Sequence, residues 1–552
     1  MVRQEDNVAN RLYLLLRRLY SDKAYLSLFM GVIASVLAYS TYSILKYYSL
    51  DASGWDLGVH AQVLWNTLHG NLFYSPLIGE NLLAEHFAPF ECLQLPIYYL
   101  FPTPISLLVF QSLFVALAAL PLYLVSEIIF AGKIKSVRAR KGISLAFGLS
   151  YLISPYTLSL ISFDFHNISF LPFFLFLSFY SFLREKRLLT LVSLALIVSL
   201  HSNFIFMAAT ILLYEFLYLR TAGGKKIKTW LLPKADARTW MNTAFFIACI
   251  ALLYGYLVLA GYLKGYLYGT PVLSAMATTG ATGTPFTSVP GLIHLVFTDP
   301  ASLFPYFVSN MNDKAMFFFI LLGSLIFLPI LSPMSLTLSV PFALYALPSN
   351  YAGYYGLGYQ YTGMIVGAMY ISALMGLYNL LEFLKRHDTF KIFQNESLKP
   401  ESGIWGVTAA ILVATILVVP IGIFSPSQVF EKPSNSQMVD VFDLHYNQED
   451  SSFLVRAQSL IPANSYILTQ NNLMPFFSDY ANAYSTPWSP GISGNLSNFQ
   501  YIVLQDGSYW AEVSSNVGSL QTIAHNYLDN GTFKVLQSDP SQNLYILVRT
   551  SL

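Results

Sequence analysis

Residues 104–130 read PISLLVFQSLFVALAALPLYLVSEIIF, an apolar run with a single charged side chain, Glu127. The hydrocarbon core of a bilayer is about 30 Å thick, so a helix needs about 20 apolar residues to cross it. This run exceeds that length and therefore predicts a membrane-spanning helix. It decides the fold class because the rest of the chain repeats the pattern.

Apolar runs of this kind recur along the whole chain and predict eleven spans. The predicted spans are residues 25–46, 104–130, 143–161, 168–183, 188–202, 204–219, 241–263, 315–332, 334–348, 363–384 and 404–424. Of the 552 residues, 55% are hydrophobic and 11% are charged, whereas about a quarter are charged in soluble domains. This composition excludes a single soluble globular domain. We expect a mainly α, polytopic helical membrane protein.

The basic residues predict the orientation of these spans. The Lys and Arg side chains concentrate in the N-terminal tail and in residues 131–142, 184–187, 220–238 and 385–399, which together hold 23 of the 30. Short loops rich in Lys and Arg stay in the cytoplasm. Because these clusters fall on alternate loops, we expect a multi-pass plasma membrane protein with a cytoplasmic N-terminus and an extracellular C-terminus. This topology requires two short spans in residues 188–219, turning at His201.

Net charge and cysteine content argue against a nucleic-acid partner and against a fold held by disulfides or zinc. The formal net charge of +1 gives no support to a nucleic-acid partner. The two cysteines, Cys92 and Cys249, are too few and too far apart for a disulfide framework or a zinc knuckle. The partner that the composition does predict is the lipid bilayer.

Three outward segments are longer than a simple connection requires, and long loops of this kind often carry function. We predict a cytoplasmic amphipathic tail at residues 1–24 and a transmembrane domain at 25–424. The transmembrane domain carries outward loops at 47–103 and 264–313. Residues 425–552 are expected to form a small extracytoplasmic α/β domain.

Each outward segment has its own sequence pattern. Apolar residues at helical spacing in the first loop (Leu57, Ala61, Leu64 and Leu68) predict a helix along the membrane surface. A start near Asp56 places Asp56 and His60 one turn apart on the same face. The second loop is rich in Gly, Thr and Ala around 277–285 and predicts a mobile flap. In the tail, we expect helices at 449–460 and 521–528 and strands at 466–469, 501–504 and 543–548.

Three stretches of the first half resemble a known family. They are Trp55–Gly70 (WDLGVHAQVLWNTLHG), Glu85–Pro89 (EHFAP) and Asp164–His166 (DFH). They resemble an uncharacterised family of predicted polytopic membrane proteins from archaea and bacteria, over most of residues 50–220. That family is similar to the GT-C glycosyltransferases, which include the dolichyl-phosphate-mannose protein mannosyltransferases.

The resemblance implies transfer of a sugar from a polyprenyl-phosphate donor to an extracytoplasmic glycan or protein acceptor. It also implies that an acidic residue of the first outward loop acts as base or metal ligand, and by position this residue is Asp56. The chain departs from the family pattern in two places. His201–Asn203 stands where relatives often have a Lys-Glu-acid cluster, and Gly358–Tyr361 has Gln and Tyr where relatives tend to have His.

The polar residues of the outward loops have side chains suited to sugar transfer, independently of the resemblance. Inverting sugar transfer to a hydroxyl needs a carboxylate that takes the acceptor proton while the donor phosphate leaves. Asp56 suits this catalytic role, although Asp is also a favoured helix N-cap. Asp164 and His166 lie two residues apart, which in an extended chain points both side chains to one side. With His60, they are expected to support Asp56 or bind the donor phosphate; the alternative is a polar tip between two spans.

Cations and metal ligands are the remaining site candidates. Lys46, Lys264 and Lys314 lie at outward span ends, where a donor phosphate requires a cation; the alternative is snorkelling to the interface. His86 and Glu85, with His60, are candidates for a divalent metal site. The sequence contains no His-Glu-x-x-His motif, and it predicts no other cofactor.

We therefore expect a GT-C-type membrane glycosyltransferase. The sequence also allows two alternative functions. One is a transporter of lipid or solute, although the spans contain few ionisable residues and no detectable internal repeat. The other is a non-catalytic membrane scaffold whose outer module binds a partner.

Overall fold

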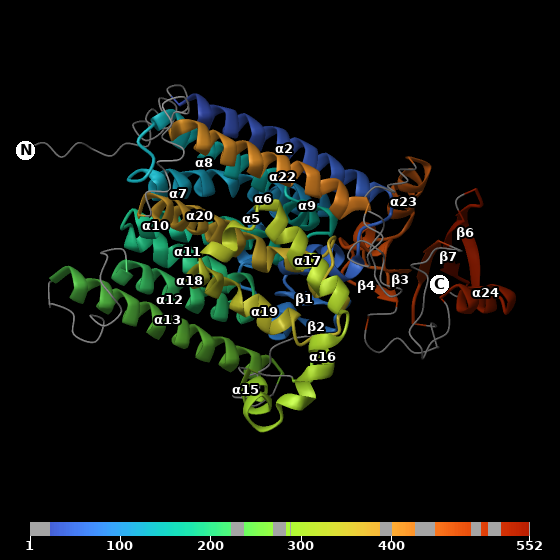
Figure 1. The fold of residues 1–552 in the computed structure, drawn as a ribbon. Helices are drawn as coiled ribbons and strands as arrows, with labels where there is room; N and C mark the ends of the chain where they lie inside the picture. Colours follow the sequence, from blue (N-terminus) through green and yellow to red (C-terminus); the bar gives the residue numbers. More distant parts are fainter. Residues whose placement is uncertain are drawn as a thin grey trace, which may run out of the picture.

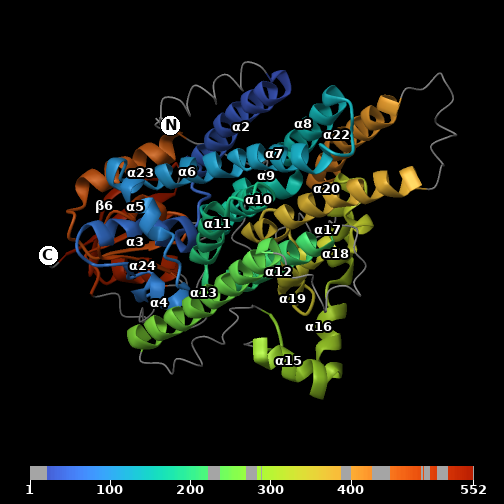
Figure 2. The same cartoon turned by 90° about the vertical axis from the view of Figure 1, so that its left-hand side faces the viewer.

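A bundle of helices forms most of the molecule, and a five-stranded sheet lies at one end of it (Figures 1 and 2). The structure is a computed structural model. It describes residues 22–221, 237–268, 283–286, 289–386, 400–424, 448–486, 489, 498–505, 520–541 and 543–550.

Five helical stretches among the described residues are long and apolar enough to cross a membrane. They are formed by α2 (Lys23–Tyr48), by α6 (Pro104–Leu117) with α7 (Ala119–Phe130), by α8 (Val137–Ile153) with α9 (Pro155–Ser162), by α13 (Ala237–Tyr268) and by α20 (Gly363–Arg386). Shorter apolar stretches are formed by α10 (Leu171–Leu183), α11 (Arg187–Leu200), α12 (Ile205–Thr221), α18 (Pro333–Leu336) with α19 (Val340–Ala346), and α22 (Pro400–Phe424). The mainly helical membrane architecture expected from the sequence is confirmed.

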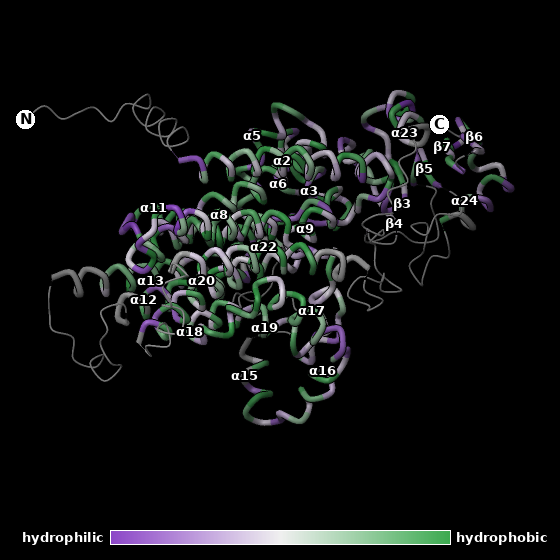
Figure 3. The backbone as a smooth tube through the Cα atoms, turned by 45° about the horizontal axis from the view of Figure 1, so that its top comes forward, coloured by the Kyte–Doolittle hydropathy of each residue, from purple (hydrophilic) through white to green (hydrophobic). Residues whose placement is uncertain are grey.

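The polarity of the helices follows their position in the bundle. Figure 3 shows that the bundle is largely hydrophobic and that hydrophilic residues gather at helix ends and in the C-terminal part. Helix breaks have local causes. Ser154 ends α8 and caps α9, with Pro155 at the first position, where proline is tolerated because its missing N–H needs no partner there.

Two predicted spans illustrate how the expectation compares with the structure. The hairpin at His201 is present, because α11 ends at Leu200 and α12 begins at Ile205. The span predicted at 315–332 is not one helix, because α17 (Met311–Ser324) is followed by a 3-10 turn at Leu328–Leu331. Ile326 and Phe327 have positive φ angles there, and this conformation interrupts a right-handed helix.

The C-terminal unit, by which we mean described residues 448–550, contains a mixed sheet with strand order β4-β3-β5-β7-β6. Strand β3 pairs in parallel with β4 and β5, and β7 pairs antiparallel with β5 and β6. Its elements are α23 (Gln448–Leu460), β3 (Ile467–Gln470), β4 (Ala483–Thr486), β5 (Tyr501–Gln505), α24 (Leu520–Asp529), β6 (Phe533–Asp539) and β7 (Leu544–Arg549).

Helices α23 and α24 and strands β3, β5 and β7 lie within one residue of the predicted segments. Strands β4 and β6 were not predicted. Strand β4 is a four-residue segment with no aliphatic β-branched residue, and β6 is an edge strand whose side chains are mostly exposed. Neither has the apolar alternation that predicts a half-buried strand.

The first long loop is folded rather than extended. It contains a π-helical turn, η1 (Gly54–Gly58), and the helix α3 (Val59–Leu68), followed by the short strands β1 (Tyr74–Ser75) and β2 (Glu80–Asn81) and the helices α4 (Leu82–His86) and α5 (Glu91–Leu100). The predicted helix is present, and its position along the membrane surface stays a prediction. Leu57, Ala61 and Leu64 are fully buried, whereas Leu68 is exposed, and α3 packs mainly against η1, β1 and α5 of the same loop.

The second long loop contains short helices that project from the bundle (Figures 1 and 2). These are α15 (Val289–Thr298) and α16 (Phe304–Val308), joined by a 3-10 turn at Pro300–Leu303. Most of the Gly- and Thr-rich segment 277–285 lies outside the described residues, so the predicted flap stays a prediction.

Candidate functional site

Asp56 and Asp164 are brought together from two different loops. Asp56 lies in the π-helical turn η1, and Asp164 follows the end of α9. Both are buried, with 8% and 5% of their surface exposed. Ser53 links them, because its backbone N–H donates to Asp164 Oδ2 at 2.8 Å and its hydroxyl is hydrogen bonded to the Asp56 carboxylate. The helix N-cap alternative for Asp56 is wrong, since Ser53 caps η1 and Gly58 precedes α3.

Lys46 supplies the positive charge next to this pair. It lies in the last turn of α2, and its Nζ is 3.3 Å from Asp164 Oδ1. The same ammonium group donates to the carbonyl oxygen of Ser162 at 2.9 Å and to that of Phe163. Three protein acceptors therefore surround Lys46, which fixes the turn carrying Asp164. Its predicted contact with a donor phosphate stays a prediction.

The electrostatic environment makes Asp56 a stronger base than an ordinary aspartate. Burial, followed by repulsion from the Asp164 charge, raises the pKa of Asp56 to about 7. His60, Ser53 and Lys46 act in the opposite direction. Burial also raises the pKa of Asp164, where Lys46 and the Ser53 N–H stabilise the ionised form. A pKa near the working pH is the value that favours general-base catalysis.

His60 is held by a buried carboxylate that the sequence analysis did not single out. His60 Nδ1 lies 2.7 Å from Glu91 Oε1, so this buried side chain fixes the orientation of the imidazole ring. Asn167 also donates to Glu91 Oε1, at 2.7 Å, and Gln94 donates to Asn167 Oδ1 at 2.7 Å. A polar pair one turn apart in the apolar α5, Glu91 and Gln94, was the signal that could have indicated this network.

His166 faces the same region from the other side. The rings of His60 and His166 are 5.9 Å apart in an edge-on arrangement. Gln111 of α6 holds the loop, accepting from the His166 N–H at 2.8 Å and donating to the Asp164 carbonyl oxygen at 2.8 Å. His166 Nδ1 accepts from the Ile168 N–H. Asp164 and His166 therefore both face loop 47–103.

Aromatic side chains from a distant segment complete this cluster. Tyr351 and Tyr361 interact electrostatically with Asp56. Their rings are 6.2 Å apart, and Tyr354 contacts both of them edge-on. Rings of this kind offer apolar faces against which a sugar packs. Two residues of the tyrosine row at 351–361 are therefore within electrostatic range of Asp56, and the choice between a sugar-stacking role and an interfacial belt stays open.

A family profile described as predicted membrane protein (DUF2079) matches residues 46–540. The chain belongs to this DUF2079 family. The match begins at Lys46 and includes both carboxylates of the cluster, as well as most of the C-terminal unit. The membrane assignment of the family agrees with the apolar helices of the structure.

Solved structures resemble this DUF2079 chain at low sequence identity. One is the archaeal oligosaccharyltransferase AglB from Archaeoglobus fulgidus in complex with an inhibitory peptide and a dolichol-phosphate, with 11% identity, a TM-score of 0.41, and coverage of 86% of this chain and 69% of that one. Another is ArnT from Cupriavidus metallidurans bound to undecaprenyl phosphate, with 14% identity, a TM-score of 0.43, and coverage of 94% and 98%. No curated protein sequence matches the chain. Both TM-scores are low, and the chemistry of the site therefore rests on its own residues.

The other predicted site residues of this family member lie elsewhere or outside the described side chains. Lys314 of α17 is 3% exposed and donates to the carbonyl oxygens of Tyr306 at 2.6 Å, Phe307 at 3.4 Å and Leu347 at 2.9 Å. It joins three segments, and its predicted phosphate contact stays a prediction. The side chains of Lys264, Glu85 and His86 are not among those described. The described residues contain no group of three or more His, Cys, Asp or Glu side chains arranged to hold a metal ion.

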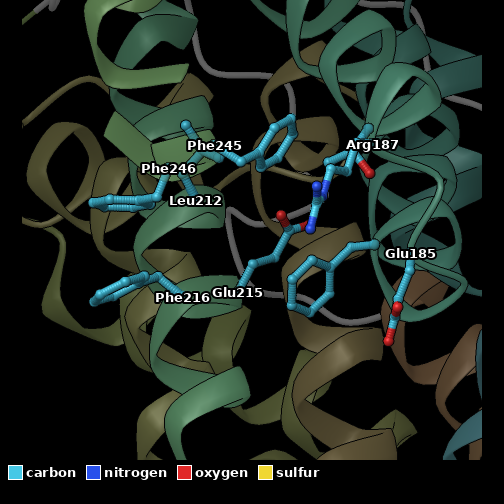
Figure 4. A pocket seen from close by; sticks show the side chains of 9 residues that line it. Glu185, Arg187, Leu212, Glu215, Phe216, Phe245 and Phe246 are labelled. Atoms are coloured by element: carbon cyan, nitrogen blue, oxygen red, sulfur yellow. The ribbon is translucent and has the colours of Figure 1, made fainter. Parts of the chain in front are cut away.

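A separate cavity of about 50 Å³ lies between α10, α11, α12 and α13 (Figure 4). It is lined by Phe182, Glu185, Arg187, Thr190, Leu212, Glu215, Phe216, Phe245 and Phe246. Glu215 is buried and accepts from the Ser178 hydroxyl at 3.2 Å. Figure 4 shows the Arg187 side chain pointing toward Glu215. The cavity volume corresponds to a few water molecules, and its walls do not include the residues of the Asp56 cluster.

Proposed function

We propose that this DUF2079 protein is a membrane glycosyltransferase that moves a sugar from a polyprenyl-phosphate donor to a hydroxyl acceptor with inversion. The observation that carries this proposal is the buried pair of carboxylates, Asp56 and Asp164, joined by Ser53. Burial and the neighbouring charge bring the pKa of Asp56 to about 7, which suits a group that must take a proton at neutral pH.

The chemistry assigned to the pair is a single displacement. Asp56 takes the proton of the acceptor hydroxyl as its oxygen attacks the anomeric carbon, and the bond to the donor phosphate breaks on the opposite face. Asp164 lies beside Lys46, and the Asp164 charge raises the basicity of Asp56. His60, which is oriented by Glu91, and His166 are proposed to supply polar side chains next to the two carboxylates.

Substrate contacts are assigned by the chemistry of the side chains available. Tyr351 and Tyr361 are proposed to pack against the sugar ring, because aromatic faces bind apolar sugar surfaces. Lys264 and Lys314 remain the cations proposed for the donor phosphate. A divalent metal at His86 and Glu85 is the alternative source of positive charge. The proposed topology places the cluster at the outer membrane face, with the N-terminus in the cytoplasm.

Purified protein in proteoliposomes tests this function directly. We would supply a panel of polyprenyl-phosphate sugars and hydroxyl acceptors, and compare wild type with Asp56→Asn for donor binding and release of the sugar. The matched control is Asp299→Asn, because Asp299 is an exposed residue that caps a 3-10 turn in the second outward loop. We expect turnover by wild type and by the control, and a loss of about 10²- to 10⁴-fold for Asp56→Asn with donor binding retained.

Two results would overturn the proposal. Full activity of Asp56→Asn would exclude Asp56 as the base. Absence of donor binding and turnover in wild type would exclude the transferase, and movement of lipid or solute across the same proteoliposomes would then identify a transporter.

A further inference from the structure

The first turn of η1 obtains its hydrogen-bond acceptors from a residue more than 400 positions away. The first N–H groups of a helix have no acceptor within that helix. Here the Gly54 N–H donates to the Asn471 carbonyl oxygen at 2.8 Å, and the Trp55 N–H donates to Asn471 Oδ1 at 3.0 Å. Asn471 directly follows β3 of the C-terminal unit and is 1% exposed. One buried asparagine, Asn471, therefore caps the turn that carries Asp56 together with Ser53.

A second contact holds the helix on the other side of Asp56. Gln62 of α3 is fully buried, and its Nε2 donates to the carbonyl oxygens of Tyr480 at 3.1 Å and Ala483 at 3.0 Å. The Gln62 Oε1 accepts from the Ser75 hydroxyl at 2.5 Å. The C-terminal unit thus contacts the chain on both sides of the segment that contains Asp56 and His60.

The packing at this contact depends on the absence of a side chain at position 54. A Cβ atom on Gly54 would lie 2.6 Å from Met474 Cβ and 2.7 Å from the Asn471 carbonyl oxygen. Both distances are too short for real contacts, and one of them is to the backbone. Tyr47, at the end of α2, stacks on Phe476 with ring centroids 4.4 Å apart. Both ribbon views place the C-terminal unit against this end of the bundle (Figures 1 and 2).

We propose that Asn471 is a positioning residue for Asp56, so that the C-terminal unit completes the catalytic site instead of serving only as an outer attachment. This inference rests on the proposed function, because it assigns Asn471 a role through the Asp56 base. Asn471 fixes Gly54 and Trp55, and these residues set the direction of the Asp56 side chain. Ser53, which links Asp56 to Asp164, directly precedes Gly54 and is also contacted by Asn471 Nδ2.

Replacement of Asn471 by alanine removes the Oδ1 acceptor and leaves the Trp55 N–H with the Ser53 hydroxyl, 3.1 Å away. The turn is then held by fewer hydrogen bonds. We expect the Asp56 carboxylate to shift away from the hydroxyl group of the substrate that receives the sugar. A displacement of about 1 Å at a catalytic group lowers the rate by up to about 100-fold. Because the cations proposed for the donor phosphate are Lys264 and Lys314 and not residues of this turn, we expect kcat to fall while donor affinity is retained.

The test compares Asn471→Ala with a matched neighbour, Asn472→Ala. Asn472 is equally buried, but its amide pairs with Gln470 and Gln505 inside the C-terminal unit. We expect kcat to fall about 10- to 100-fold for Asn471→Ala, with an unchanged donor Kd, and to stay near wild type for Asn472→Ala. Asn471→Asp keeps an Oδ1 acceptor for the Trp55 N–H and should therefore retain a higher kcat than Asn471→Ala. Equal losses in the two alanine variants, or no loss in Asn471→Ala, would overturn the positioning role.

A second readout does not depend on activity. Hydrogen–deuterium exchange of a peptide covering residues 53–58 should be faster in Asn471→Ala than in wild type, and unchanged in Asn472→Ala. Unchanged exchange in Asn471→Ala would refute the anchoring itself. If wild type transfers no sugar, the proposed function fails and the catalytic role of Asn471 with it, whereas exchange still reports whether Asn471 holds the turn.

Gly54→Ala provides the variant needed if Asn471→Ala does not fold. It leaves every residue of the C-terminal unit unchanged but forces Met474 and Asn471 away from η1. We expect the same fall in kcat and the same faster exchange at residues 53–58. Normal kcat in folded Gly54→Ala would contradict the proposal.

Discussion

The raised pKa of Asp56 predicts that its neutralisation stabilises the protein above pH 7. The pKa is about 7 in the folded protein, whereas an ordinary aspartate has a pKa of 3.8. A carboxyl group whose pKa is raised by folding contributes stability that is fully present below the unfolded pKa and is lost as pH rises through the folded pKa. A tenfold change in the acid dissociation constant corresponds to about 1.36 kcal/mol, so the ionised Asp56 side chain destabilises the fold by about 4 kcal/mol at high pH.

Asp56→Asn should therefore be more stable than wild type, by an amount that depends on pH. Below about pH 4, Asp56 is protonated in both states and the variant gains nothing by this route. From there to about pH 7 the difference grows, and above that pH it reaches its full value of about 4 kcal/mol. Part of the gain is lost if the amide leaves a hydrogen bond to Ser53 unmade.

Thermal melting in detergent micelles between pH 4.5 and 8.5 measures this effect. Wild type, Asp56→Asn and the exposed control Asp299→Asn would be compared at each pH. We expect the melting temperature of Asp56→Asn to diverge upward from wild type as pH rises to 7 and then to stay parallel. A difference that does not vary with pH, or a less stable Asp56→Asn at pH 8, would refute the assigned pKa.

Three further predictions follow from contacts around the site and in the bundle. The kcat/KM of wild type should rise about tenfold per pH unit below pH 7 and level off above it, because only ionised Asp56 accepts a proton; a rate independent of pH from 5 to 8 would contradict this. Lys46→Met should destabilise the fold by about 3–5 kcal/mol in denaturation measurements, because it leaves buried Asp164 without its cation. The double variant Lys46→Met with Asp164→Asn should recover much of that loss. Gly376→Ala should destabilise by at least about 1–3 kcal/mol through overpacking, because the new Cβ would lie 1.9 Å from the Leu328 carbonyl oxygen; an unchanged melting temperature would show that α20 moves freely at this point.

The sequence predicts the elements that depend on local pattern. Apolar runs predicted the helices because a membrane span is defined by length and composition, both of which can be counted along the chain. The turn at His201 followed from basic clusters on either side of 188–219. The interrupted span at 315–332 could not be predicted from local pattern. Ile326 and Phe327 have positive φ angles there, and the next residue, Leu328, packs closely against Gly376 of α20.

The candidate site was predicted in part, and the missing residues share one property. Asp56, Asp164, His60 and His166 were found because they stand in short polar motifs within otherwise apolar loops. Glu91 and Asn471 were missed because their roles depend on contacts with residues 31 and 416 positions away in the sequence. The polar pair Glu91 and Gln94 marks a polar position in the apolar α5, but a single sequence does not show which distant residue pairs with Glu91 or with Asn471. The N-cap alternative for Asp56 failed for the same reason, since the acceptors of that turn come from Ser53 and from the C-terminal unit.

Burial of Asp56 connects the stability of the protein with its proposed chemistry. Asp56 would be an ordinary weak base if water reached its carboxylate, because desolvation is the largest cause of its raised pKa. The turn that carries Asp56 is covered by the loop after β3, where Asn471 and Met474 contact it. The C-terminal unit therefore supplies both the geometry and the dry surroundings that make this carboxylate basic. The same burial accounts for the loss of stability at high pH. A variant that exposes Asp56 to water should therefore lower the pKa of Asp56 and, by the same step, reduce the destabilisation that its ionisation causes at high pH.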